Sequence, residues 1–259
     1  MIEFELNDGI ARITIDRAEK KNAFTQQMWR TLAQHCENFQ AAWLAKADHA
    51  PRAVILQGVP GAFCAGADIQ ELHAALQDPL AMASNHAAVL SAGLALTNLP
   101  MPTMAVIDGP CFGGGFALAA ACDFRIGSTR CSFAITPARL GLLYGLEDTR
   151  LVVRLIGDAK ARRMLMRSER IGAAKAFDWG ILDTLVEPGA LADLSAQRAQ
   201  EMARISRTSM AGIKATLGLL SNLSPTTAAQ LHADFESAFR GPDFAEGAKA
   251  FLERREPQF

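Results

Sequence analysis

The chain has 259 residues, of which half are hydrophobic and a fifth are charged, and its formal net charge is -1 at pH 7. This balance is typical of a globular protein and gives no electrostatic basis for binding nucleic acid or an anionic membrane. No apolar run approaches the roughly 20 residues that span a bilayer, and the N-terminal sequence lacks the pattern of a signal peptide. The five cysteines show no CxxC pairing, so we expect packing thiols in a cytoplasmic protein.

The first predicted elements are a hairpin, a helix and a buried strand. The segments IEFEL and IARITID alternate apolar and polar residues around the turn sequence NDG, which predicts two antiparallel strands. From Thr25 to about Lys46 the apolar residues recur at helical spacing, and Thr25 is a suitable N-cap. RAVILQG predicts a buried strand, and the loop that follows it opens into a helix near Asp68.

The middle of the chain repeats the order of strand and then helix. A helix is expected over about 79–97, and the strand MPTMAVIDG then leads through three glycines into another helix. CDFRIGS and CSFAIT predict short strands. Strand signals end near Asp193, and the last helix is expected over about 244–256. We therefore expect an α/β core over 1–192 and a helical region over 193–259.

Two loops expose backbone amides where a helix begins. In AFCAGAD, Ala67 stands between Gly66 and Asp68, and in FGGGFALAA, Gly114 opens a helix. First-turn amides have no partner within the helix, and glycine lets a ligand approach the backbone. Two such amides aimed at one point would form an oxyanion hole, which stabilises a developing negative charge by about 3 kcal/mol per donor. Alone, each loop is equally compatible with a tight strand-to-helix turn, and GGG is not a GxGxxG fingerprint.

Together, the two loops resemble the signatures of the crotonase superfamily, that is, the enoyl-CoA hydratase/isomerase family. AFCAGADIQEL is similar to its first signature and IDGPCFGGGFALAAACDFRI to its second, and the resemblance extends from IARITID near the start to EGAKAFLERREPQF at the end. It implies an α/β, ClpP-like spiral of repeated ββα units with a C-terminal helical trimerisation region. It also implies a homo-trimer or a dimer of trimers.

By the same resemblance, the amides of Ala67 and Gly114 polarise the carbonyl of an acyl-CoA thioester. Coenzyme A enters as part of the substrate, and no separate cofactor or metal is expected. Further residues are implied in binding CoA and the acyl group, and the tail positions among them often act on a neighbouring subunit. These residues are Ala23, Phe63, Ala65, Asp68, Ile69, Gly113, Thr136, Phe251 and Arg254.

The chain departs from the family where proton transfer is expected. A hydratase of this family uses two glutamates, and the corresponding positions in this chain are Ala117 and Ala138. Neither alanine can act as an acid or a base, which argues against hydration by two glutamates and against the common double-bond isomerisation. Decarboxylation of a malonyl-type thioester forms the same enolate by losing CO₂, without a base.

The segment FAITPARLGLLYG resembles the methylmalonyl-CoA decarboxylase branch of the family, with Thr136 and Tyr144 at the spacing of that branch. Against this assignment, the branch tends to carry a histidine where this chain has Ala67. Tyr144 either orients the departing carboxylate or a water, or packs at a turn with its hydroxyl bonded to backbone. The reaction therefore stays open between a lyase, acting by decarboxylation or by hydration with a non-standard acid, and an isomerase. A non-catalytic acyl-CoA-binding protein is the alternative from another class.

Three other side chains are candidates for acid or base chemistry. Glu147 and Asp148 are either catalytic acids or first-turn helix charges favoured by the helix dipole. His73 lies near the first loop, where a half-exposed helix residue is the simpler interpretation. Asp123 is expected to tie strands together rather than to act on a substrate.

Overall fold

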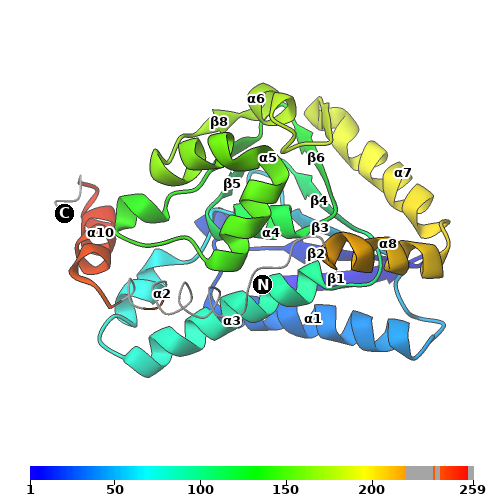
Figure 1. Cartoon of the computed structure of the whole chain (residues 1–259), viewed down its shortest axis with the longest axis horizontal. Helices are drawn as coiled ribbons and strands as arrows, with labels where there is room; N and C mark the ends of the chain where they lie inside the picture. The colour runs from blue at the N-terminus through cyan, green and yellow to red at the C-terminus, as the bar shows by residue number, and fades with distance from the viewer. Residues whose placement is uncertain (220–235, 237–239, 256–259) are drawn as a thin grey trace.

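The computed structural model describes residues 1–219, 236 and 240–255, and within them the strands form two sheets (Figure 1). The larger sheet has six strands in the order β1-β2-β3-β4-β6-β9, and the smaller has three in the order β5-β7-β8. The strands are β1 (Ile2–Asn7), β2 (Ile10–Ile15), β3 (Ala53–Gly58), β4 (Thr103–Ile107), β5 (Pro110–Phe112), β6 (Phe124–Ser128), β7 (Ser132–Ala134), β8 (Ile171–Gly172) and β9 (Thr184–Val186).

The predicted hairpin is confirmed. β1 and β2 pair antiparallel, and the turn residues Asp8 and Gly9 have φ values of 52° and 75°. A two-residue hairpin turn needs left-handed backbone at both positions, which an Asp-Gly pair accepts. The remaining strands of the larger sheet pair parallel to one another, so their carboxyl ends lie at one edge, where the helices of the site begin.

The helices surround the two sheets (Figure 1). They are η1 (Ala18–Lys20), α1 (Gln26–Leu44), α2 (Ile69–Ala74), α3 (Pro79–Thr97), α4 (Gly114–Ala121), η2 (Pro137–Leu140), α5 (Leu146–Met166), α6 (Ala173–Asp178), η3 (Pro188–Ala190), α7 (Leu191–Ala203), α8 (Arg207–Leu219) and α10 (Pro242–Glu253). The predicted cap of α1 is confirmed, because the Thr25 side chain accepts the N–H of Met28.

Helix α3 is a longer apolar segment than the sequence led us to expect in this chain. Its 19 residues and mean hydropathy of 1.3 are enough, by length and composition alone, to cross a membrane. However, Ala88, Ala92 and Leu96 are buried in the main hydrophobic core, and the Arg30 side chain of α1 donates to Ser84 of α3. These contacts place one face of α3 against the rest of the chain, and 28% of its apolar stretch is buried.

The C-terminal helices lie in two different places. Leu191 and Ala199 of α7 pack against the larger sheet, whereas Phe244 and Ala248 of α10 pack in a cluster with Leu72 of α2. A Cβ on Gly247 would lie 2.4 Å from Leu140, so α10 is closely applied to η2. The predicted division at 192/193 stays a prediction, and the predicted end of the last helix at 256 lies outside the described residues.

Candidate active site

The two loops that expose amides are held side by side. Cys64 and Cys111 form an isolated parallel bridge, the Cys64 N–H donates to the Pro110 carbonyl at 3.1 Å, and the Phe112 N–H donates to the Cys64 carbonyl at 2.9 Å. A Cβ on Gly115 would lie 2.4 Å from the Cys64 carbonyl oxygen, closer than real Cβ atoms come to any atom. Glycine at 115 therefore lets α4 begin directly against the first loop.

The amides of Ala67 and Gly114 are the unpaired donors of this arrangement. Phe24 donates to Gly66 and accepts from Asp68, both at 2.8 Å, so this bridge leaves the intervening Ala67 amide unused. Gly114 is the first residue of α4, where an amide has no partner within the helix. In the described part of the chain, no acceptor is within hydrogen-bond distance of either N–H group.

Gly66 shows how near these two amides lie to each other. A Cβ built on Gly66 would be 3.4 Å from the Gly114 nitrogen, and Gly66 itself has a φ of +102°, which favours glycine. Ala67, the next residue, carries the other free N–H. Two unpaired donors at such close range are the arrangement that an oxyanion hole requires.

An aromatic wall closes one side of the Gly114 amide. The ring atoms Cζ2 and Cη2 of Trp29 would lie 3.0 and 3.1 Å from a Cβ on Gly114, and the Phe24 ring is centred 4.3 Å from the Trp29 ring. Among the residues implied in binding, Ala23, Ala65 and Ile69 are partly exposed. Phe63 is fully buried, so it supports the first loop from inside instead of lining an open pocket.

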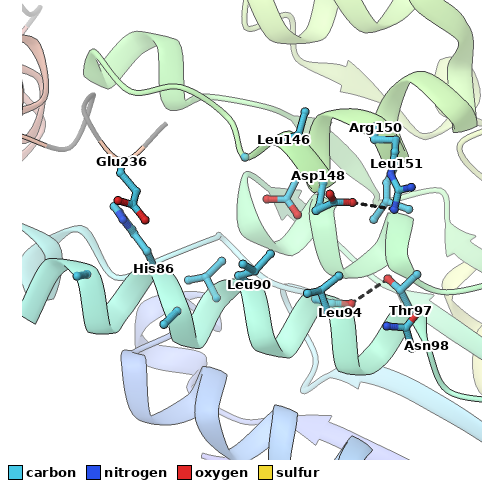
Figure 2. A pocket seen from close by; sticks show the side chains of 16 residues that line it. His86, Leu90, Leu94, Thr97, Asn98, Leu146, Asp148, Arg150, Leu151 and Glu236 are labelled. Carbon is cyan, nitrogen blue, oxygen red and sulfur yellow. Dashed lines mark hydrogen bonds and ion pairs between the residues drawn. The ribbon is translucent and has the colours of Figure 1, made fainter. Parts of the chain in front are cut away.

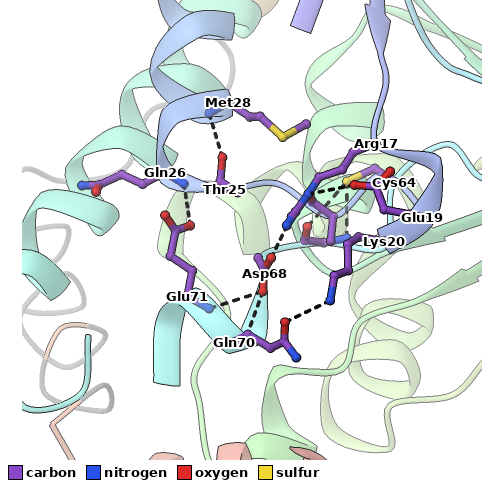
Figure 3. Close-up of polar contacts among 12 residues, drawn as sticks. Arg17, Glu19, Lys20, Thr25, Gln26, Met28, Cys64, Asp68, Gln70 and Glu71 are labelled. Carbon is purple, nitrogen blue, oxygen red and sulfur yellow. Dashed lines mark hydrogen bonds and ion pairs between the residues drawn. The ribbon is translucent and has the colours of Figure 1, made fainter. Parts of the chain in front are cut away.

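Asp68 is fixed in place at the start of α2 (Figure 3). Its Oδ2 lies 2.7 Å from Nη1 of Arg17, and its Oδ1 accepts from the N–H groups of Gln70 at 2.9 Å and Glu71 at 3.3 Å. Burial by itself raises the Asp68 pKa, but the hydrogen bonds from Arg17 and from the two amides lower it below its usual value. Asp68 is therefore an ionised helix cap, and both of its oxygens are occupied.

Tyr144 forms a hydrogen bond to Gly113, in the glycine loop that precedes α4. Its hydroxyl donates to the Gly113 carbonyl oxygen at 3.0 Å, and the same oxygen accepts the Ala117 N–H at 3.1 Å. Burial raises the Tyr144 pKa well above its usual value, so the hydroxyl keeps its proton. The structure thus shows the hydroxyl bonded to backbone. Because a phenol has one proton to donate, this arrangement leaves none for a substrate carboxylate.

The positions of the family glutamates lie apart in this structure. Ala117 is buried in the first turn of α4, whereas Ala138 is exposed in η2, next to the implied binding residue Thr136. Neither side chain can exchange a proton. The first carboxyl groups that follow Ala138 in the sequence are those of Glu147 and Asp148 at the start of α5.

Glu147 and Asp148 have different surroundings in the first turn of α5. Glu147 forms an ion pair with Arg150 at 2.7 Å, whereas Asp148 has no hydrogen-bond or ion-pair partner in the described part of the chain. Asp148 lines a cavity of about 220 Å³ between α3 and α5 (Figure 2). Burial, and to a lesser extent the charge of Glu147, raises the Asp148 pKa to about 6. No pattern in the sequence indicates which of these two neighbouring carboxylates is the better candidate for an acid or base.

The other candidates lie outside this cluster. The Asp123 carboxylate accepts from the Thr103 N–H at 2.8 Å and from Lys214 Nζ at 2.6 Å, which confirms its predicted structural role. His73 is exposed in the last turn of α2. Phe251 is 57% exposed and Arg254 caps the end of α10, so neither is enclosed by the loops of the same chain. Within the described ranges, no group of three His, Cys, Asp or Glu side chains could hold a metal ion.

Comparison with known proteins identifies the class that this fold and site define. Residues 5–259 match the family model described as enoyl-CoA hydratase/isomerase, and the chain belongs to this family. A probable enoyl-CoA hydratase of Rhodobacter capsulatus is 31% identical over 261 residues, which cover 100% of this chain and 97% of that protein. The 1,2-epoxyphenylacetyl-CoA isomerase of Escherichia coli K12 is 28% identical over 268 residues, covering 100% and 99%.

Solved structures show the same architecture. An enoyl-CoA hydratase from Mycobacterium avium subsp. paratuberculosis superposes with a TM-score of 0.84 at 25% identity, over 100% of this chain and 98% of that chain. A methylmalonyl-CoA decarboxylase in complex with 2-nitronate-propionyl-CoA superposes with a TM-score of 0.85 at 25% identity, over 100% and 97%. The protein therefore has the α/β crotonase fold, with two sheets and C-terminal helices.

Proposed function

We propose that the protein is an acyl-CoA lyase that decarboxylates a malonyl-type thioester and stabilises the resulting enolate at the amides of Ala67 and Gly114. One observation carries the proposal: two unpaired N–H groups lie on adjoining loops, while Ala117 and Ala138 supply no proton-transferring group. The site thus has the hydrogen-bond donors that stabilise an enolate, but it lacks the base that usually forms one.

The proposed reaction needs no group that abstracts a proton. The bond between the α-carbon and the carboxylate breaks, its electron pair moves into the thioester, and CO₂ leaves. The negative charge that develops on the thioester oxygen is stabilised by the two amides, each contributing about 3 kcal/mol. A carboxylate at position 117 or 138 would repel the anionic substrate, and alanine at both positions removes that repulsion.

Tyr144 acts in this proposal as a positioning residue. Its hydroxyl donates to Gly113, and the peptide group whose oxygen it contacts is the one whose N–H belongs to Gly114. A hydrogen bond accepted at the oxygen of an amide makes its N–H a stronger donor. The similarity to the solved methylmalonyl-CoA decarboxylase supports the same reaction class.

Hydration is the second candidate, because one carboxyl group near the site, that of Asp148, has no partner in the described part of the chain. A hydratase would use it to transfer a proton between water and the substrate. A non-catalytic acyl-CoA-binding protein is the third. A binding protein would not need the glutamates that Ala117 and Ala138 replace. It would, however, have no use for the unpaired amides of Ala67 and Gly114.

The test compares methylmalonyl-CoA with crotonyl-CoA, following CO₂ release and the mass of the CoA product for the first and enoyl-thioester absorbance for the second. We expect CO₂ and propionyl-CoA from the first and no reaction with the second. Gly114→Pro and Ala67→Pro each remove one N–H and are expected to slow CO₂ release by about 100-fold or more.

Gly114→Ala is the matched control. It keeps the N–H but places a Cβ 3.0 Å from the Trp29 ring, so it reproduces the crowding caused by the Cβ of proline without removing the donor. We expect it to lose much less activity than Gly114→Pro. Hydration of crotonyl-CoA without CO₂ release would favour the second candidate, and tight binding of both thioesters without turnover would favour the third.

A further inference from the structure

The cavity between α3 and α5 is bounded mainly by apolar side chains. Leu90 and Leu94 of α3 lie on one side, and Leu146 and Leu151 of α5 lie on the other (Figure 2). Its volume of about 220 Å³ is enough for a short alkyl group and too small for a CoA moiety. Charged side chains line it as well: Glu147, Asp148 and Arg150 come from the start of α5, and Glu236 comes from the C-terminal region.

The charged and titratable groups around Asp148 leave its carboxyl group unneutralised. On α5, Glu147 is paired with Arg150 at 2.7 Å. On α3, His86 lines the cavity, but burial and the charge of Arg240 lower its pKa to about 4, so it is neutral near pH 6. Glu236 also lines the cavity, and its carboxylate lies 3.9 Å from the Arg240 side chain. Burial and Glu147 therefore raise the Asp148 pKa to about 6, which suits a general acid near neutral pH.

The cavity adjoins the residues that support the oxyanion hole. Gly145 lines it, and a Cβ on Gly145 would lie 2.9 Å from Oδ2 of Asp148. The preceding residue, Tyr144, donates to Gly113, whose carbonyl group shares a peptide bond with the Gly114 N–H. The charge of Asp148 also contributes to the raised pKa of Tyr144. Tyr144 thus interacts with the Asp148 carboxyl group and with the peptide group that carries the Gly114 N–H.

We propose that Asp148 is the acid that protonates the enolate, with the alkyl part of the acyl group lying in the cavity between α3 and α5. The O–H bond of the Asp148 carboxyl breaks, and its proton forms a C–H bond at the carbon that CO₂ has left, using the electron pair of the enolate. The Asp148 carboxylate then takes a proton from water. The reaction named here rests on the proposed function, whereas contact between Asp148 and the acyl group can be tested without turnover.

The turnover test uses methylmalonyl-CoA in D₂O, with Asp148→Asn compared with the wild type. Asp158→Asn is the matched control, because Asp158 lies in α5 just beyond its kink at Gly157, and it is exposed and paired with Arg162 at 2.7 Å. We expect the wild type to deliver deuterium to one face of propionyl-CoA and to slow as the pH rises through about 6. Asp148→Asn is expected to release CO₂ at least about tenfold more slowly, without this pH dependence and with deuterium on both faces. Asp158→Asn is expected to match the wild type.

The second test needs no reaction. In protein labelled with ¹³C at the Asp carboxyl carbons, one signal that titrates near pH 6 should be absent from Asp148→Asn, and its midpoint should move when propionyl-CoA binds. Unchanged stereochemistry in Asp148→Asn, or a titration that propionyl-CoA leaves unmoved, would overturn the proposal. If the wild type releases no CO₂ at all, the proposed function fails, and the titration still decides whether Asp148 meets the acyl group.

Discussion

The hydroxyl of Tyr144 donates a 3.0 Å hydrogen bond to the carbonyl oxygen of Gly113. The Ala117 N–H, at 3.1 Å, is the second donor to the same oxygen. The peptide group between Gly113 and Gly114 is thus polarised at its oxygen by two donors, and its N–H has no acceptor in the described part of the chain. The strength of that donor thus depends on a residue that lies 31 positions beyond Gly113 in the sequence.

Tyr144→Phe should weaken the oxyanion hole without disturbing the fold, since the ring stays and only the hydroxyl is lost. We expect about a tenfold slower turnover, in the range of one lost hydrogen bond. In wild type, bound propionyl-CoA labelled with ¹³C at the thioester carbonyl should resonate downfield of free ligand, and the variant should show a smaller shift. An unchanged carbonyl shift with unchanged turnover would show that the hydroxyl does not act on the hole.

Gly115→Ala should separate the two loops. Its Cβ would meet the Cys64 carbonyl oxygen at 2.4 Å and the Cys64 Cβ at 2.7 Å, and neither backbone can move without breaking the bridge at Cys111. We expect a loss of about 3 kcal/mol or more in the free energy of unfolding, measured by urea denaturation. Gly212→Ala on α8, with no atom within 4 Å of its Cβ, should instead be neutral or stabilising by up to about 1 kcal/mol.

Asp68→Asn should destabilise the first loop at neutral pH, because it keeps the helix cap but loses the charge that pairs with Arg17. We expect about 1–3 kcal/mol. A lowered carboxyl pKa gives stability that is present above the unfolded value, 3.8, and is lost as the pH falls through the folded value. The difference from wild type should therefore hold at pH 7 and disappear near pH 2 in denaturant titrations.

Asp78→Asn is the control for this measurement. Asp78 caps α3 in the same way, through the N–H groups of Leu80 and Ala81, but it forms no ion pair in the described part of the chain. Asparagine caps a helix about as well as aspartate. An equal loss of stability in both variants would mean that the pair with Arg17 contributes nothing.

Asp148→Asn should stabilise the protein at pH 7.5. Burial raises the Asp148 pKa to about 6, so between pH 4 and 6 the folded state holds this proton more tightly than the unfolded state does. Wild-type stability therefore falls as the pH rises through that interval. We expect the variant to be more stable by about 1–3 kcal/mol at pH 7.5 and equal to wild type at pH 4, measured by thermal unfolding. A higher melting temperature at both pH values would contradict this account.

The sequence alone was sufficient to predict the features that depend on short stretches of chain. The alternation around Asp8 and Gly9, the cap at Thr25 and the helix over 79–97 follow from local backbone preferences and periodicity. The glycines of the second loop likewise marked a close backbone approach, which the structure shows between Gly115 and Cys64. Family membership followed from signatures within single loops.

Only the tertiary structure decided how these stretches meet. The pairing of Cys64 with Cys111, the contact of Tyr144 with Gly113 and the burial of Phe63 join residues from different elements, and no local pattern encodes which partner each one finds. The same is true of the two neighbouring carboxylates at the start of α5. Both line the cavity between α3 and α5, but Glu147 pairs with Arg150, whereas Asp148 has no hydrogen-bond or ion-pair partner in the described part of the chain. What surrounds each side chain is set by the packing of α3 against α5.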